Sequence, residues 1–156
     1  MDAPGFPERT AAVRRAASRL CLRLAWAPLH EVSLPNGRRA DILALRNDGA
    51  FVCIEVKSGL RDFQTDLKWP EYREFSDQLY FAVDVDFPHA ILPPETGLIV
   101  VADDQAELIR EAPEHKLPAA RRTALLRRFA LLAGSRLAML EDPAGVADLR
   151  TLLRVE

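Results

Sequence analysis

Three charged residues interrupt two apolar segments in the first half of the chain. Asp41 lies within residues 38–46, and Glu55 and Lys57 lie within residues 50–57, whose other side chains are mostly hydrophobic. Charged side chains are rarely buried unless they are paired or bind a metal ion. Two carboxylates can hold a divalent cation, and an ammonium group beside them can stabilise developing negative charge. The three residues therefore predict a metal-dependent hydrolytic site.

The expected chemistry is the attack of water on a phosphodiester. Mg²⁺ or Mn²⁺ binds carboxylate and backbone carbonyl oxygens, so we expect Asp41, Glu55 and the carbonyl of Val56 as ligands. Such a metal lowers the pKa of a bound water and polarises the phosphodiester. Lys57 would orient that water or stabilise the charge of the transition state. The alternative is an ordinary ion pair between Lys57 and one of the acids.

The turn at residues 47–49 decides whether the two acids meet. Side chains alternate between the two faces of a strand, so the pairing register determines which residues share a face. A three-residue turn places Asp41 opposite Glu55, whereas a two-residue Asp48-Gly49 turn places Asp41 opposite Val56. The site therefore requires the three-residue turn with Gly49 at positive φ, or a compensating bulge.

The other elements predict an α/β fold. Apolar spacing and turn residues indicate helices and strands along the whole chain. We expect helices at 8–25, 60–68, 70–79, near 104–111, at 119–133 and after Pro143, and strands at 31–34, 38–46, 50–57, 79–83 and 97–102. The first three strands should form an antiparallel meander. The order predicts a mixed β-sheet with helices on both faces.

Composition narrows the class of protein. A chain of 156 residues suggests a single domain over residues 1–156, and its net charge of -2 excludes a globally basic surface. The sequence has neither a signal-peptide pattern nor an apolar segment long enough to cross a bilayer, so we expect a cytoplasmic protein with no membrane partner. Cys21 and Cys53 are expected as buried thiols. The scattered histidines argue against a zinc site.

Two motifs resemble known families. Arg39-Ala40-Asp41 followed by Ile54-Glu55-Val56-Lys57-Ser58 resembles the PD-(D/E)XK nuclease-like superfamily, with Ala40 in place of the usual proline. A longer pattern, over about residues 30–130, resembles the bacterial MmcB-like DNA-repair family; it comprises Leu34–Asp41, Glu55–Ser58, Asp62-Phe63, Asp66–Tyr72 and Leu79–Val83. The resemblance implies a restriction-endonuclease-like core and a role in DNA repair. It also implies that Asp41 and Glu55 ligate the metal and that Lys57 is the catalytic lysine.

Further residues are candidates for supporting roles. Many members of the superfamily carry a glutamate on the first helix; here Glu8 lies only at its start, so Glu31 is the better fourth acid. Asp62 and Asp66, spaced i, i+4, share a helix face and would either make an outer contact to the metal or form a solvated surface. Arg38, Arg39 and Lys68 are candidate contacts to DNA phosphates. Trp69 and Tyr72 are better explained as core residues than as stacking platforms.

Three functions follow from these observations. The leading one is a metal-dependent DNA endonuclease that acts in DNA repair. The second is a catalytically inactive nuclease-like module that binds DNA or a repair-protein partner. The third is a structural interaction domain with neither metal nor DNA. A homodimer is compatible with the first, because nucleases that cut duplexes are commonly dimeric, although no interface can be identified from the sequence.

Overall fold

The computed structural model describes residues 5–65 and 68–145. Two compact units make up the chain, Met1–Leu117 and Pro118–Glu156, and each is described by itself. Within the described residues, no helix is both long and apolar enough to cross a membrane.

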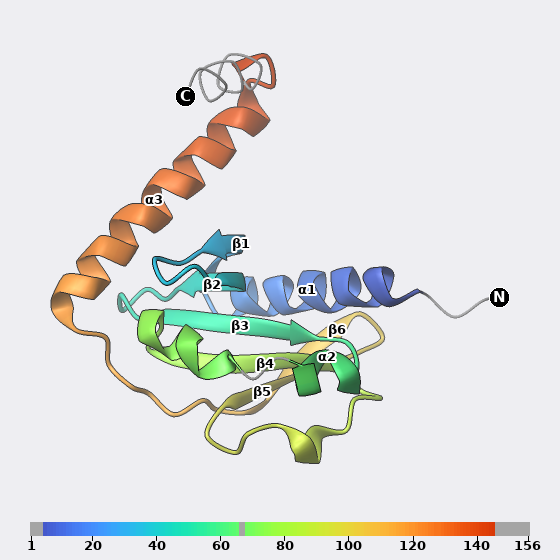
Figure 1. Cartoon of the computed structure of the whole chain (residues 1–156). Coiled ribbons are helices and arrows are strands. Elements are labelled where there is room, and N and C mark those ends of the chain that lie inside the picture. Colours follow the sequence, from blue (N-terminus) through green and yellow to red (C-terminus); the bar gives the residue numbers. More distant parts are fainter. Residues whose placement is uncertain (1–4, 66–67, 146–156) are drawn as a thin grey trace. The chain divides into compact units, whose positions relative to one another are not determined.

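The first unit is built on one six-stranded sheet (Figure 1). The strands lie in chain order: β1 (Ala27–Ser33), β2 (Arg39–Leu45), β3 (Phe51–Lys57), β4 (Gln78–Asp84), β5 (Gly97–Ala102) and β6 (Gln105–Arg110). β1, β2 and β3 pair antiparallel, β3, β4 and β5 pair parallel, and β6 returns antiparallel to β5. The predicted antiparallel meander and mixed sheet are thus confirmed.

Helical segments cover both faces of this sheet. α1 (Phe6–Arg23) lies on one face, and α2 (Leu60–Thr65) and η1 (Trp69–Phe75), a 3-10 helix, lie on the other. A short 3-10 helix, η2 (His89–Ile91), precedes β5. The second unit contains α3 (Ala119–Glu141), which extends beyond the predicted end at residue 133. The predicted α/β fold with flanking helices is confirmed.

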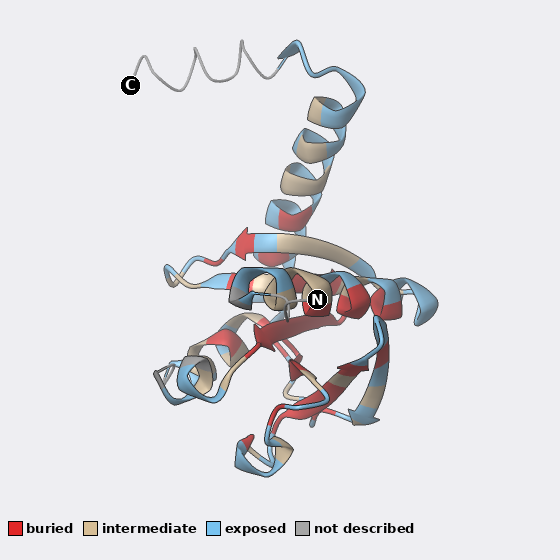
Figure 2. Ribbon diagram, turned by 90° about the vertical axis from the view of Figure 1, so that its right-hand side faces the viewer, coloured by how far each residue is buried: buried red, intermediate tan, exposed pale blue. Residues whose placement is uncertain are grey.

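Two hydrophobic cores follow from these layers (Figure 2). The apolar side of α1, with Val13, Ala17 and Leu20, packs with Ile54 and Tyr80 of the sheet. On the other face, aromatic rings of α2 and η1 pack against Phe81, with ring centroids 5.6 Å from Phe63 and 6.1 Å from Trp69. Every residue of β3 is buried. Because helices lie on both faces of the sheet, both sides of β3 are buried, and its sequence is almost continuously apolar.

One predicted helix is wrong. Residues 105–110 form strand β6 instead of a helix near 104–111. Asp103 and Asp104 adopt φ values of 49° and 61°, the left-handed conformation that a two-residue hairpin turn requires. Val101 then pairs with Ala106 and Val100 with Glu107. The short turn keeps residues 105–110 extended, because they complete their backbone hydrogen bonds on the edge of β5.

Other boundaries also differ from the prediction. β1 begins at Ala27, four residues before the predicted strand, and the helical stretch after Pro70 is a 3-10 helix that ends at Phe75. The short helix predicted after Pro143 falls mainly on residues outside those described. Cys21 and Cys53 are buried free thiols, as expected, and burial raises the pKa of Cys21 to about 12.

A buried aspartate ties the sheet to the segment after β6. Asp77, at the start of β4, is fully buried. Its carboxylate accepts the backbone N–H of Phe51 at 2.7 Å and that of Leu117 at 2.9 Å. Its own N–H donates to the carbonyl of Phe51 at 2.8 Å, and its carbonyl accepts the N–H of His115 at 2.8 Å. Asp77 therefore joins three segments that are distant in sequence.

Candidate functional site

The turn between β2 and β3 sets the register of the two candidate acids. Gly49 has a φ of 87°, and its N–H donates to the carbonyl of Arg46 at 3.0 Å. The N–H of Arg46 donates to the carbonyl of Ala50 at 2.9 Å, which closes a three-residue turn. Ile42 consequently pairs with Ile54, and the same register places Asp41 opposite Glu55. The predicted turn and register are confirmed.

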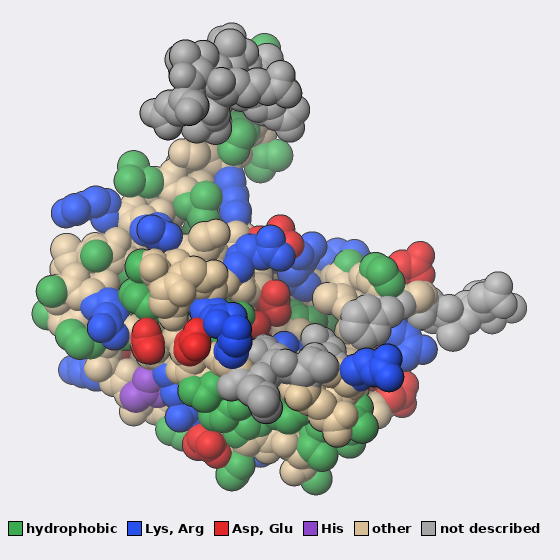
Figure 3. Space-filling model, viewed as in Figure 1, with side chains coloured by type: hydrophobic (Ala, Val, Ile, Leu, Met, Phe, Trp, Pro, Cys, Tyr) green, Lys and Arg blue, Asp and Glu red, His purple; other side chains and the backbone are tan. Residues whose placement is uncertain are grey.

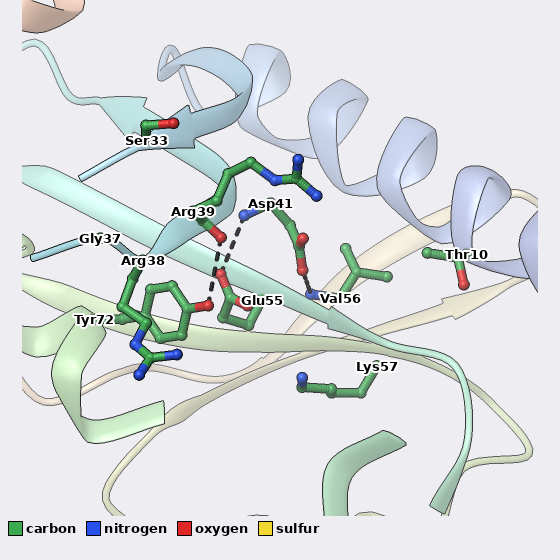
Figure 4. Close-up of a pocket in the computed structure, with 10 residues that line it drawn as sticks. All are labelled: Thr10, Ser33, Gly37, Arg38, Arg39, Asp41, Glu55, Val56, Lys57 and Tyr72. Atoms are coloured by element: carbon green, nitrogen blue, oxygen red, sulfur yellow. Dashed lines mark hydrogen bonds between the residues drawn. The ribbon is translucent and has the colours of Figure 1, made fainter. Parts of the chain in front are cut away.

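The hydrogen bonds between β2 and β3 change from backbone–backbone to side chain–backbone at Asp41 and Glu55. Backbone pairing of β2 with β3 extends from Leu45 and Phe51 to Ile42 and Ile54. Beyond that pair, side chains make the contacts (Figure 4). Glu55 Oε1 accepts the N–H of Asp41 at 3.1 Å, and Asp41 Oδ2 accepts the N–H of Val56 at 2.8 Å. These reciprocal bonds hold both carboxylates at the end of the hairpin.

Glu55 is a buried acid whose charge is poorly compensated. Its side chain is only 3 % exposed. Burial raises the pKa of Glu55 well above its ordinary value, and the nearby Asp41 carboxylate raises it further. The N–H of Asp41 and the charge of Lys57 act in the opposite direction but do not cancel these effects. The site therefore favours either a proton on Glu55 or an additional positive charge between the two acids.

The donor atoms at this position suit a hard divalent cation. Carboxylate and carbonyl oxygens are the ligands that Mg²⁺ and Mn²⁺ prefer. The N–H of Val56 points toward Asp41, and the N–H and C=O of one strand residue point to the same side. By this geometry we expect the Val56 carbonyl on the side of β3 that faces Asp41. In the described part of the chain, no group of three or more Asp, Glu, His or Cys side chains has metal-binding geometry.

The acids open into a pocket of about 650 Å³. Figure 4 shows Asp41 and Glu55 between Arg38 and Tyr72 on one side and Lys57 on the other. Lys57 is 5 % exposed and lies two residues from Glu55 on the same strand, so both side chains face the pocket. The pocket lining also includes Thr10, Ser33, Gly37, Arg39 and Val56. The site thus combines two acids with one lysine and two arginines.

The 3-10 helix η1 forms one wall of this pocket. Glu71 pairs with Arg38, and its backbone carbonyl accepts the side-chain N–H of Asn36 at 3.0 Å. Tyr72 donates from its hydroxyl to the carbonyl of Arg39 at 3.4 Å. These contacts fasten the turn before β2 to η1. The sequence assigned Tyr72 to the core; it is 8 % exposed, so it is buried and also lines the pocket.

Thr10 is a pocket residue that sequence reasoning missed. Its hydroxyl lies 2.8 Å from that of Ser58, directly after β3. This hydrogen bond joins α1 to the end of the strand that carries Glu55 and Lys57. The Ser58-Gly59 break was visible in the sequence, but nothing in the helix pattern pointed to Thr10, because the two residues are 48 positions apart.

Two further candidates, Glu31 and Lys68, lie outside the pocket. Glu31 has a φ of 50° and forms an ion pair with Arg14 at 3.5 Å, with 52 % of its side chain exposed. Neither Glu31 nor the exposed Lys68 lines the pocket. The side chain of Asp62 and all of Asp66 fall outside what the structure describes. The roles proposed for these four residues stay predictions.

Fold and site together define a mixed-sheet α/β protein with two acids and a lysine at the open end of a β-hairpin. The family model for DNA repair protein MmcB-like matches residues 2–144. The chain therefore belongs to the MmcB-like family of DNA repair proteins.

Two solved structures are similar to this chain. A protein of unknown function from Silicibacter pomeroyi has 36% sequence identity and a TM-score of 0.84, covering 93% of this chain and 97% of that protein. A repair endonuclease from Pyrococcus abyssi has 16% identity and a TM-score of 0.33, covering 56% of this chain and 40% of that chain. No curated protein matches the sequence.

Proposed function

We propose that this protein is a metal-dependent endonuclease of the PD-(D/E)XK type that hydrolyses DNA during repair. The observation that carries the proposal is the meeting of Asp41 and Glu55 across the hairpin, with Lys57 facing the same pocket. Membership of a DNA-repair family supports DNA as the substrate. The pocket lies open at the surface, as a site for a polymeric substrate requires.

The metal ligands would be Asp41, Glu55 and the carbonyl of Val56, with Mg²⁺ or Mn²⁺ as the cofactor. When bound, the cation would lower the pKa of water and polarise the phosphodiester. Glu55 supports this assignment, because its pKa is raised by burial and by the neighbouring Asp41 carboxylate, and a cation between the two acids would offset both effects. Loss of the Glu55 proton would be a condition for metal binding.

Lys57 would act on the substrate itself. Its side chain reaches the pocket along the face that carries Glu55. Burial strengthens its electrostatic effect, because little water is present to screen the ammonium group. We assign it to the stabilisation of charge that develops on the phosphoryl oxygens during attack by water.

Arg38, Arg39 and Lys68 would contact DNA phosphates. Arg38 and Arg39 line the pocket, whereas Lys68 lies outside it. Phosphate contacts position a protein on DNA but do not read its sequence. The proposal therefore predicts activity that depends on DNA structure more than on sequence, and weaker binding at higher salt concentration.

A cleavage assay tests the proposal. Plasmid, branched and single-stranded DNA would be incubated with the protein and either Mg²⁺, Mn²⁺ or EDTA. We expect metal-dependent cleavage that falls by about 10²- to 10³-fold or more in Asp41→Ala, Glu55→Ala and Lys57→Ala. Asp84→Ala is the matched control, because this acid ends β4 and does not line the pocket. Cleavage that survives Asp41→Ala and Glu55→Ala together would refute the endonuclease.

A non-cleaving DNA-binding module is the second candidate. On the face that carries α2 and η1, the basic and acidic side chains of the described residues are interspersed and form no broad basic surface among themselves (Figure 3). Arg38 is already paired with Glu71. Calorimetric titration with Mn²⁺ separates the two candidates. DNA binding that is unchanged by EDTA and by both alanine substitutions would favour the binding module.

A further inference from the structure

An ion pair at the edge of the pocket joins Arg38 to the 3-10 helix η1. Arg38 Nε donates to Glu71 Oε2, and the two side chains are 29 % and 43 % exposed. Ion pairs that are this exposed contribute little to the stability of a fold. Arg38 also lines the pocket that holds Asp41 and Glu55. The position of this pair therefore indicates a role in ligand binding more than in folding.

Asn36 fixes the backbone of both partners of the ion pair. Its side-chain amide donates to the carbonyl of Glu71 at 3.0 Å, and its side-chain oxygen accepts the N–H of Arg38 at 3.1 Å. One side chain thus bonds the backbones of two residues that are 33 positions apart. Arg38 is consequently held at two points, through its main-chain N–H and through Nε.

The ion pair uses only one side of the guanidinium group. Nε is bonded to Glu71, whereas no described residue accepts a hydrogen bond from either Nη atom of Arg38. The N–H groups on the two Nη atoms form a planar fork that fits two oxygens of one phosphate. Figure 4 shows Arg38 beside Tyr72, on the opposite side of the two acids from Lys57. A DNA strand that crosses the acids would place a flanking phosphate there.

We infer that Glu71 is a positioning residue, which holds Arg38 so that both Nη groups face a backbone phosphate of DNA bound across the pocket. An arginine without a partner loses rotamer freedom when it binds, and this cost weakens binding. Glu71 removes most of the cost, because Arg38 is ordered before DNA binds. Arg39 is the contrast: its side chain is exposed and has no hydrogen-bond partner among the described residues. The inference rests on the proposed function in one respect, that the pocket binds DNA.

The test is the DNA affinity of a variant that has lost a negative charge. Glu71→Ala removes the side-chain contact but keeps the backbone carbonyl that Asn36 bonds. If Glu71 only neutralised Arg38, its removal would strengthen DNA binding through a gain in positive charge. A positioning role predicts the opposite: the Kd should rise about three- to tenfold, the cost of ordering one long side chain. A Kd that falls or stays the same, or a wild type that binds no DNA, overturns the inference.

Glu74→Ala is the matched control. Glu74 is an exposed acid on the same 3-10 helix and does not line the pocket. Its removal changes the net charge by the same amount without freeing Arg38, so the Kd should stay the same or fall slightly. Fluorescence anisotropy of a short labelled DNA, single-stranded and duplex, in EDTA measures both variants. Equal weakening by Glu74→Ala and Glu71→Ala would contradict a specific role of the ion pair.

Two further variants separate positioning from a general effect on the fold. Glu71→Gln retains an acceptor oxygen for Nε and should bind DNA nearly as well as the wild type. Arg38→Lys keeps the charge but lacks the fork, so it should bind about as weakly as Arg38→Ala. Urea denaturation verifies that each variant is folded. The inference fails if Glu71→Gln is as weak as Glu71→Ala, or if Arg38→Lys binds like the wild type.

A double-mutant cycle decides whether Glu71 acts through Arg38. Arg38→Ala alone should raise the Kd by about tenfold or more, because it removes charge-assisted hydrogen bonds to the phosphate. In that background, Glu71→Ala should cause no further loss, since no guanidinium remains to be held. Additive losses would show that Glu71 acts independently and would overturn the inference. Because affinity is measured without metal, cleavage can be absent while the inference holds, and the inference can fail while cleavage is present.

Discussion

The two ends of strand β3 hold buried carboxylates in opposite electrostatic conditions. At its start, Asp77 accepts the N–H groups of Phe51 and Leu117, which offset the cost of burying its charge. At its end, Glu55 accepts the N–H of Asp41 but also lies beside the Asp41 carboxylate, and its pKa is raised. Burial is common to both acids. Compensation of the charge is what separates a structural carboxylate from a candidate ligand.

Among the substitutions that test this difference, the largest expected loss of stability is at Asp77. Asp77→Asn retains the shape of the side chain but replaces one acceptor oxygen with an NH₂ group. One of the two N–H donors, from Phe51 or Leu117, then loses its acceptor in a buried position. We expect a loss of about 3 kcal/mol in the free energy of unfolding, measured by urea denaturation.

Binding of Mn²⁺ to Asp77→Asn, measured below the denaturation midpoint, is the control. It should match that of the wild type, because Asp77 does not line the pocket. A stable variant that no longer binds metal would mean that the two ends of β3 are not separate in function.

At the other end of β3, the substitution Glu55→Gln should stabilise the protein. In the metal-free chain, folded Glu55 keeps its proton at pH values where the unfolded chain has lost it. Stability should therefore fall as the pH rises above the ordinary carboxyl value of 4.5 and toward the raised folded pKa. Glu55→Gln cannot ionise and should remove this slope.

Urea denaturation in EDTA across this pH range measures the effect. At neutral pH, Glu55→Gln should be more stable than the wild type by on the order of 1 kcal/mol, and it should no longer cleave DNA. Asp84→Asn, at a half-buried acid outside the pocket, should leave the slope unchanged. Equal pH dependence in the wild type and Glu55→Gln would show that Glu55 is compensated as well as Asp77.

The smallest expected effect is at the turn that places the acids opposite each other. Gly49 has a φ of 87°, and a Cβ there would meet no atom within 4 Å. Gly49→Ala should therefore cost about 1 kcal/mol through backbone strain alone. Thermal denaturation should show a smaller loss for Gly49→Asn, because asparagine tolerates this conformation better.

Activity of Gly49→Ala tests whether the turn alone holds the register. We expect cleavage to be retained, because the pairs from Leu45–Phe51 to Ile42–Ile54 also maintain it. Loss of cleavage in a stable Gly49→Ala protein would show that the backbone pairs between β2 and β3 are not sufficient to align Asp41 with Glu55.

The sequence predicted most of the sheet and the alignment of the candidate acids. Long apolar segments identified β3 and β5, and the sequence offered two turn lengths, of which the structure shows the three-residue turn that brings Asp41 opposite Glu55. It failed at β6, where six residues with mixed polarity suit a helix or a strand equally well. Their conformation follows from the left-handed turn at Asp103 and Asp104 and from the open edge of β5. Neither feature is apparent in a short window of sequence.

Local rules thus sufficed for the hairpin, because alternation along strands and the length of a turn are properties of neighbouring residues. The sequence placed Glu55 and Lys57 on one face and made the face of Asp41 depend on the length of the turn at residues 47–49. Only the tertiary structure decided what surrounds them: η1 as a wall through Glu71 and Tyr72, Thr10 at the far side, and Asp77 as an anchor for β3. These contacts join residues 26 to 48 positions apart, and they form only when the folded chain brings its separate layers together.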